Sequence, residues 1–245
     1  MIDMRKIGPC TTIVAANFIG ATSLLLLGVF LLQGPIWGID LRLSTVAALG
    51  LDGALCLMFF MQHSGMVRTS FQRQLGAILP GHYHGAIYAI VSGVTLLTLL
   101  LFWQPSALTL FSAHGPLRWL LRGAYLGAIT GFAWGVRALG SFDGFGTRPL
   151  RAEIQGKTLN PVSLLSIRGP YRWVRHPLYA FTLILLWSYP DLTADRLLLN
   201  VLWTIWIFTG SVLEERDLVS VFGESYREYQ RQVPMLLPLR LPHPN

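Results

Sequence analysis

Long runs of apolar residues constrain this chain more than any other feature of its sequence. A helix needs about 20 apolar residues to cross a hydrocarbon core of about 30 Å. Four runs of that length precede residue 140, at 11–33, 43–62, 84–103 and 117–139. They predict four transmembrane helices in this part of the chain.

Two further apolar runs, 178–189 and 197–213, flank the turn sequence Tyr189-Pro190-Asp191. Because proline ends a helix, the pair predicts a helical hairpin. The first arm has only about a dozen residues before the proline, so it spans only if it starts near Pro177 or forms a shorter, tilted helix. We expect six spans, with five as the alternative.

The composition agrees with a membrane protein, since 53% of the 245 residues are hydrophobic and 13% are charged. We therefore predict an all-α, polytopic integral membrane helix bundle that forms one domain over residues 1–245. Residues 1–139 would hold the first four helices, and 140–245 a long loop, the hairpin and a tail. Cys10 and Cys56 alone make neither a disulfide framework nor a metal site.

The formal net charge of +7 could indicate nucleic-acid binding, but the 19 basic residues are spread over loops. Anionic lipid headgroups are the simpler partner. Lys and Arg are frequent in 1–10, 63–83, 140–177 and the tail, while 104–116 has none, and 34–42 and 190–196 have one each. By the positive-inside rule, both termini and the basic loops are cytoplasmic, which in a bacterium places the chain in the inner membrane.

Dense polar clusters bracket the hairpin. Arg175-His176-Pro177-Leu178-Tyr179 lies where a loop enters a helix, with Pro177 suited to the first helical position. Arg175 can fork onto a carboxylate, and the pair Glu214 and Glu215 follows the second arm on the same membrane side. Such a set suits a zwitterion that carries a carboxylate and an ammonium group.

Four tyrosines near these clusters offer flat faces to a base or an onium centre: Tyr171, Tyr179, Tyr226 and Tyr229. The alternative to a binding site is a purely structural role for these residues. They would then form an aromatic belt, with positive-inside arginines and Glu-Arg pairs on a solvated helix. That alternative explains any one of these residues better than a binding site does. The ordered set favours a site, because ionisable groups at a membrane edge are costly to place.

The sequence Arg175-His-Pro-Leu-Tyr179, followed by Glu214-Glu-Arg-Asp-Leu218 and Phe222-Gly-Glu-Ser-Tyr226-Arg-Glu-Tyr229, resembles the C-terminal signature of a membrane superfamily. The superfamily comprises isoprenylcysteine carboxyl methyltransferases, phospholipid N-methyltransferases and NnrU-like proteins. The resemblance implies S-adenosylmethionine binding by the hairpin and tail. This matches the absence of a strand-Gly-x-Gly-x-x-Gly-helix pattern, so no Rossmann domain is expected.

Three further segments resemble the methanethiol S-methyltransferases, which make dimethyl sulfide: Met61-Gln62-His63-Ser64-Gly-Met66-Val-Arg68, Phe142-Asp143-Gly-Phe145-Gly146 and Val233-Pro-Met-Leu-Leu-Pro238. The similarity reaches from about Asp52 to Pro238. It implies that the cofactor is contacted by Tyr171, Arg175, His176, Pro177, Tyr179, Glu214, Glu215, Tyr226 and Tyr229. The resemblance also implies a catalytic role for Arg175.

The implied reaction is direct displacement at a sulfonium methyl group. Such a reaction depends mainly on positioning and on a dry pocket, since thiolate and sulfonium charges cancel. A thiol with a pKa near 8.5 is mostly protonated at neutral pH and needs a base. We expect His63 as that base, with Asp143 orienting it, although a lone His at a helix end is more often a satisfied interfacial residue.

Two other polar features are interpreted as structural. His82 and His84 flank Tyr83 but have no Cys or carboxylate at ligand spacing, so we expect a loop and no metal. Asp52 lies within the second span and should pair with Arg137 or a hydroxyl group.

Three alternatives to a small-thiol methyltransferase remain open from the sequence. The acceptor could be lipid-linked, as a prenylcysteine carboxylate or a phospholipid amine. The chain could also be an NnrU-like accessory protein that transfers no methyl group, or a scaffold bundle without a ligand.

Overall fold

A computed structural model describes residues 4–140, 142–158, 165 and 167–239 of the chain. The described chain is mainly helical and divides into two compact units. The first unit comprises residues 1–105 and 143–162, and the second comprises 106–142 and 163–245. Each unit contains one of the polar clusters discussed below.

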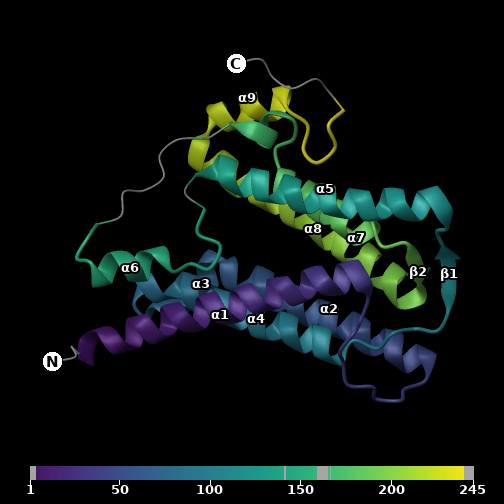
Figure 1. Cartoon of the computed structure of the whole chain (residues 1–245). Helices are drawn as coiled ribbons and strands as arrows, with labels where there is room; N and C mark the ends of the chain where they lie inside the picture. The colour runs from purple at the N-terminus through teal and green to yellow at the C-terminus, as the bar shows by residue number, and fades with distance from the viewer. Residues whose placement is uncertain (1–3, 141, 159–164, 166, 240–245) are drawn as a thin grey trace. The chain divides into compact units, whose positions relative to one another are not determined.

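The first unit is built on three long helices, α1 (Met4–Gln33), α2 (Thr45–Val67) and α4 (His84–Phe102). Between α2 and α4 lie the short helix α3 (Thr69–Gly76) and the 3-10 turn η1 (Gly81–Tyr83), and α6 (Arg148–Ile154) completes the unit. Helices α1 and α4 lie side by side (Figure 1). Gly93 permits their close approach, because a Cβ there would lie 2.8 Å from Ile19 Cγ2.

Asp52 is fully buried in the first unit, and its Oδ1 accepts a hydrogen bond of 2.9 Å from the backbone N–H of Gln104. The sequence predicted Arg137 or a hydroxyl group as its partner. The donor of this hydrogen bond is a backbone amide that follows the last turn of α4, a group that the side chains of the sequence do not reveal.

The second unit contains α5 (Gly115–Leu139), η2 (Gly169–Arg172), α7 (Pro177–Trp187), α8 (Ala194–Phe222) and α9 (Glu224–Gln232). Helix α7 packs along α5, where Gly135 makes room for Leu178. Pro177 begins α7 and the helix ends at Trp187, three residues before Pro190. Gly223, with φ +59°, separates α8 from α9.

A two-stranded antiparallel sheet departs from the all-helical prediction. Strand β1 (Thr109–Ser112) pairs with β2 (Asp191–Thr193), and Ser112 lies opposite Asp191. Strands this short show no alternation in the sequence, and their pairing joins segments about 80 residues apart in the chain. Sequence periodicity therefore could not predict them.

Within the part of the chain that the structure describes, four helical segments are long and apolar enough to cross a membrane: Gly8–Gln33, Thr45–Val67, Gly81–Phe102 and Ala194–Phe222. Three of them match predicted spans. The fourth is the whole of α8, and it extends the predicted second arm of the hairpin at both ends. Helix α7, with 11 residues, is apolar but shorter than a span.

Candidate functional site

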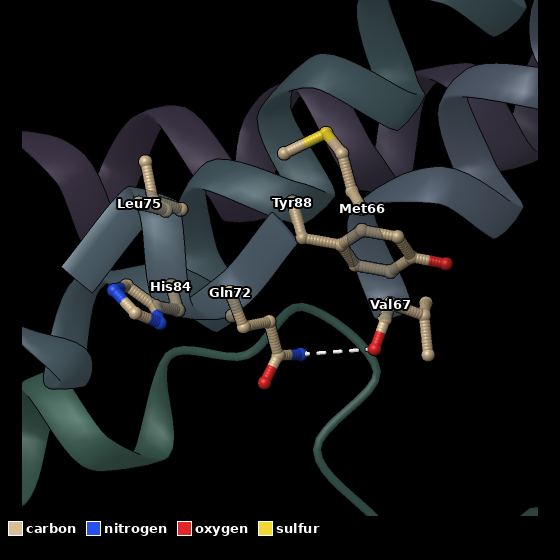
Figure 2. Close-up of a pocket in the computed structure, with 7 residues that line it drawn as sticks. Met66, Val67, Gln72, Leu75, His84 and Tyr88 are labelled. Atoms are coloured by element: carbon tan, nitrogen blue, oxygen red, sulfur yellow. Dashed lines mark hydrogen bonds between the residues drawn. The ribbon is translucent and has the colours of Figure 1, made fainter. Parts of the chain in front are cut away.

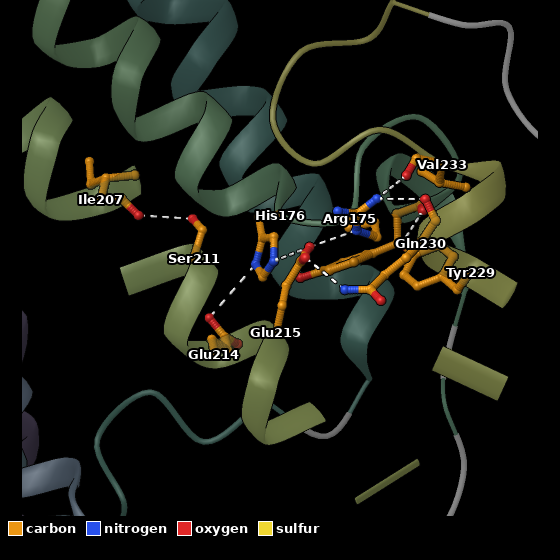
Figure 3. Close-up of polar contacts among 10 residues, drawn as sticks. Arg175, His176, Ile207, Ser211, Glu214, Glu215, Tyr229, Gln230 and Val233 are labelled. Carbon is orange, nitrogen blue, oxygen red and sulfur yellow. Dashed lines mark hydrogen bonds and ion pairs between the residues drawn. The ribbon is translucent and has the colours of Figure 1, made fainter. Parts of the chain in front are cut away.

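Arg175 is the centre of a buried ionic network in the second unit (Figure 3). Its Nε donates to Glu215 Oε1 at 2.6 Å, and the two side chains are 9% and 11% exposed. Its Nη1 donates to the carbonyl of Gln230 at 3.0 Å and also to that of Val233. The guanidinium group thus joins the segment before α7, the last part of α8 and the end of α9 with the residue that follows it.

Glu215 is held by two further groups. Its Oε1 lies 3.2 Å from His176 Nε2, and its Oε2 accepts a 2.8 Å hydrogen bond from Gln230 Nε2. Charge-assisted contacts of this kind are stronger and more directional than neutral ones. Glu215 is therefore fixed in orientation before any ligand arrives.

Glu214 differs from its neighbour. Its Oε2 lies 3.7 Å from His176 Nδ1, but its side chain is 46% exposed. The His176 ring consequently lies between two consecutive carboxylates, one enclosed and one open. This arrangement leaves Glu214 as an accessible anion beside a buried imidazole.

The chain after α9 is hydrogen-bonded to the two residues that precede α7. The backbone N–H of Arg175 donates to Pro234 O at 2.9 Å, and that of His176 donates to Met235 O at 3.0 Å. Tyr226, Tyr229 and Val233 are buried together and pack against Leu218 and Phe222. The turn at Gly223 makes this possible, because its positive φ lets α9 fold back on α8.

The predicted aromatic residues divide into two groups. The rings of His176 and Tyr179 are stacked, with centroids 5.5 Å apart and an interplanar angle of 10°. Tyr226 and Tyr229 are only 2% and 4% exposed, and the hydroxyl of Tyr229 donates to Tyr171 O. Tyr226 and Tyr229 are buried and pack beneath the tail. The stacked rings of His176 and Tyr179 present a flat surface beside the carboxylates.

The phenols of Tyr171, Tyr226 and Tyr229 are neutral at physiological pH. Burial, with a smaller contribution from the negative charge of Glu214, raises the pKa of Tyr171 to about 12. Burial also raises the pKa of Tyr226 and of Tyr229 above the usual value. Their hydroxyl groups act as hydrogen-bond donors and acceptors and carry no charge.

His63 and Asp143, predicted as a base and its orienting acid, lie in the first unit with different partners. His63 Nε2 is 2.7 Å from the hydroxyl of Tyr88. Both carboxylate oxygens of Asp143 cap α6, accepting from the N–H groups of Thr147 at 3.1 Å and Arg148 at 2.8 Å. The partner that the structure gives His63 is thus a tyrosine, and Asp143 stabilises a helix N-terminus.

Sequence reasoning missed Tyr88, Gln230 and the carbonyl groups of the tail. Tyr88 lies on α4, 25 residues from His63, and no motif marked it. Gln230 follows the predicted Tyr229 directly, yet glutamine is common on exposed helices. Among the described residues, no group of three or more His, Cys, Asp or Glu could hold a metal ion.

The fold and the network together define a class: a helical integral membrane protein with a buried Arg-Glu-His site at the ends of its helices. The chain is 34% identical over 198 residues to a methanethiol S-methyltransferase from Pseudomonas deceptionensis, covering 78% of this chain and 73% of the relative. It is 36% identical over 187 residues to methanethiol S-methyltransferase 2 from Bradyrhizobium diazoefficiens, covering 75% and 71%. The chain belongs to the family of the methanethiol S-methyltransferases.

More distant similarity reaches Nurim from Xenopus laevis, at 27% identity over 69% of this chain and 62% of that protein. No protein-family model matches the chain. No solved structure matches it either.

Proposed function

We propose that this protein transfers a methyl group from S-adenosylmethionine to methanethiol and releases dimethyl sulfide. The observation that carries the proposal is the similarity to several methanethiol S-methyltransferases over about three quarters of the chain. The alternatives of a lipid-linked acceptor and of a non-enzymatic accessory protein have no comparable support.

The network around His176 fits the proposed donor. When bound, S-adenosylmethionine supplies a methyl group on a positively charged sulfur, and it also carries an ammonium group. The open carboxylate of Glu214 can bind the ammonium group, and the stacked rings of His176 and Tyr179 offer a face to a planar base. We assign donor contact to these three residues together with Tyr171 and Pro177.

Arg175, Glu215, Tyr226 and Tyr229 have a positioning role in this proposal. The guanidinium group of Arg175 already donates to Glu215 and to two tail carbonyl groups, so its capacity to fork onto a ligand carboxylate is largely used. The two buried tyrosines hold the tail against α8. These residues fix the donor site before binding, which lowers the entropic cost of binding.

On the acceptor side, His63 accepts the thiol proton. A thiol has a pKa near 8.5, so a nearby imidazole increases the thiolate fraction at neutral pH. Tyr88 fixes the ring of His63 through their 2.7 Å hydrogen bond. Asp143 contributes indirectly, by capping α6.

Six membrane crossings with a cytoplasmic donor site are part of the proposal. The pairing of β1 with β2 supports it, because it brings together two loops, 104–116 and 190–196, that are poor in basic residues. Helix α7 alone reaches about 16 Å, which is shorter than the core. The partly extended residues 188–193 can supply the remaining length, at up to about 3.3 Å per residue.

The test is headspace dimethyl sulfide from purified protein given S-adenosylmethionine and methanethiol. A Glu214→Ala/Glu215→Ala double variant is the control. Product from the parent alone supports the proposal. If the parent binds the donor but forms no dimethyl sulfide, a small-thiol acceptor is wrong and a lipid-linked one becomes the candidate; if it does not bind the donor, methyl transfer itself is refuted.

A further inference from the structure

The first unit contains a small cavity at the point where α2 ends and α4 begins, with α3 beside it (Figure 2). Its volume is about 100 Å³. Met66 and Val67 line it from α2, Leu75 from α3, and His84 and Tyr88 from α4. No residue of the donor network in the second unit belongs to this lining, so the cavity is a separate feature.

The volume limits what the cavity can hold. A water molecule takes up about 30 Å³ of liquid, and a cavity of about 150 Å³ can hold benzene. A cavity of 100 Å³ therefore accepts a molecule smaller than benzene, such as the smallest organic thiols. The pocket is partly open, since Val67 in its lining is 52% exposed, so this volume describes the part of an occupant that the pocket surrounds.

The lining also limits the polarity of the occupant. Its polar groups already have partners within the protein: Gln72 Nε2 donates to Val67 O at 3.4 Å, and His84 Nε2 lies 3.2 Å from Leu79 O. The Tyr88 hydroxyl is 2.7 Å from His63 Nε2. What remains is a mostly apolar surface to which Met66 contributes a flexible, polarizable side chain.

The wall of the cavity connects directly to a polar chain between α2 and α4. Gln62 donates to the thioether of Met66 at 3.0 Å and to Ser92 Oγ at 3.2 Å, and it accepts from Thr95 at 2.9 Å. Polar residues inside membrane-spanning helices are costly and commonly mark a functional site. Met66 is thereby held by a hydrogen bond from Gln62, and Tyr88 is held separately by its hydrogen bond with His63.

We propose that this cavity binds the methyl acceptor as a neutral, short-chain thiol, and that Leu75 sets the upper limit on its size. The inference rests on the proposed function, because it assigns the acceptor of that reaction. It adds a binding site in the first unit and a specificity-determining residue on α3.

Substitution of Leu75 tests the size limit. Leu75→Phe fills the cavity and is expected to raise KM for methanethiol about tenfold or more, with unchanged Kd for S-adenosylmethionine. Leu75→Ala enlarges it and is expected to raise kcat/KM for propanethiol relative to methanethiol. Ile78→Phe is the matched control, since Ile78 is 82% exposed and does not line the cavity. An unchanged KM and thiol preference in both Leu75 variants would overturn the proposal.

Binding of dimethyl sulfide without donor separates this proposal from the proposed function. The loss of dimethyl sulfide from the headspace over detergent-solubilised protein is compared between the parent and Leu75→Phe at equal detergent. Greater uptake by the parent supports the cavity even if no methyl transfer is detected. Equal uptake by parent and variant refutes it even if dimethyl sulfide is produced.

Discussion

At the scale of single residues, Arg175 is proposed to position the donor site through its contacts within the protein. One guanidinium group contacts a carboxylate on α8 and two carbonyl groups of the tail. The planar, forked geometry of arginine allows three such contacts at once, whereas a lysine ammonium is a compact point charge. The positioning role of Arg175 therefore depends on shape as well as on charge.

Arg175→Lys is expected to weaken S-adenosylmethionine binding although the charge is kept. A lost hydrogen bond to a charged group costs about 1.5–3 kcal/mol, which corresponds to a rise in Kd of about tenfold to a hundredfold. Kd is measured by isothermal titration calorimetry in detergent. Arg227→Lys is the control, because Arg227 is 55% exposed and pairs with Glu224 on the surface; equal effects of the two substitutions would contradict the positioning role.

His63→Ala is expected to reduce kcat/KM for methanethiol far more at pH 6.5 than at pH 9. At pH 9 a thiol with a pKa near 8.5 ionises without help, whereas at pH 6.5 it needs a base. Headspace assays at both pH values measure the ratio to the parent. A loss of the same size at both values would mean that His63 acts only in structure.

At the scale of elements, contacts made by loops and strands hold the helices of each unit in register. In the second unit, Arg118 at the start of α5 forms a bidentate ion pair with Asp191 on β2, at 2.9 and 2.8 Å. Ser112 on β1 donates to the same carboxylate. In the first unit, the backbone of Gly146 lies against that of Gly85 at the start of α4.

Asp191→Asn is expected to lower Tm at pH 7 by about 2–4 °C, because a partly exposed pair of this geometry contributes about 1 kcal/mol. The two hydrogen bonds from Arg118 lower the pKa of Asp191. A lowered pKa in the folded state stabilises the protein above the unfolded value near 3.9, and this contribution is lost as the pH falls through the folded value. The difference in Tm between variant and parent should therefore shrink below about pH 4. Glu153→Gln, at an exposed site, serves as the control.

Gly146→Ala is expected to destabilise the first unit more than Gly156→Ala does. Both glycines have positive φ, +60° and +64°, so both substitutions carry a backbone cost of about 1–2 kcal/mol. Only at Gly146 would the new Cβ meet backbone, at 2.2 Å from the carbonyl carbon of Gly85. Differential scanning fluorimetry in detergent measures the difference in Tm, and equal values for the two variants would show that the close approach is easily relieved.

At the scale of the whole molecule, orientation in the membrane decides which compartment supplies the donor. The loops rich in Lys and Arg and the donor network are proposed to be cytoplasmic. Helix α8, with 29 residues, is about 43 Å long and exceeds the hydrocarbon core, so its last turns can carry Glu214 and Glu215 beyond the core.

Cysteine labelling in intact cells tests this orientation. In a Cys10→Ser/Cys56→Ala background, Leu110→Cys on β1 is expected to react with a membrane-impermeant maleimide, because Leu110 is 49% exposed and its loop is proposed to be outside. Lys157→Cys, also at an exposed position, is expected to react only after the cells are lysed. The reverse pattern would invert the orientation, and labelling of both or neither in intact cells would rule out six crossings.

The sequence by itself determined the helices and the identity of the polar clusters. Apolar runs of membrane length predicted α1, α2, α4 and α5, since a backbone in lipid must satisfy its own hydrogen bonds, although α1 begins seven residues before its predicted run and α2 ends five residues after its own. The ordered motifs likewise singled out Arg175, His176, Glu214 and Glu215, and the structure brings these four together.

Only the tertiary structure decided how those residues divide their roles. Glu215 is enclosed and Glu214 is open, although they are neighbours in sequence, because successive residues on a helix point in different directions. Tyr88 beside His63, the tail carbonyl groups around Arg175 and the pairing of β1 with β2 all join segments distant in the chain. Local sequence patterns report periodicity and chemistry, but such long-range contacts depend on how the helices pack.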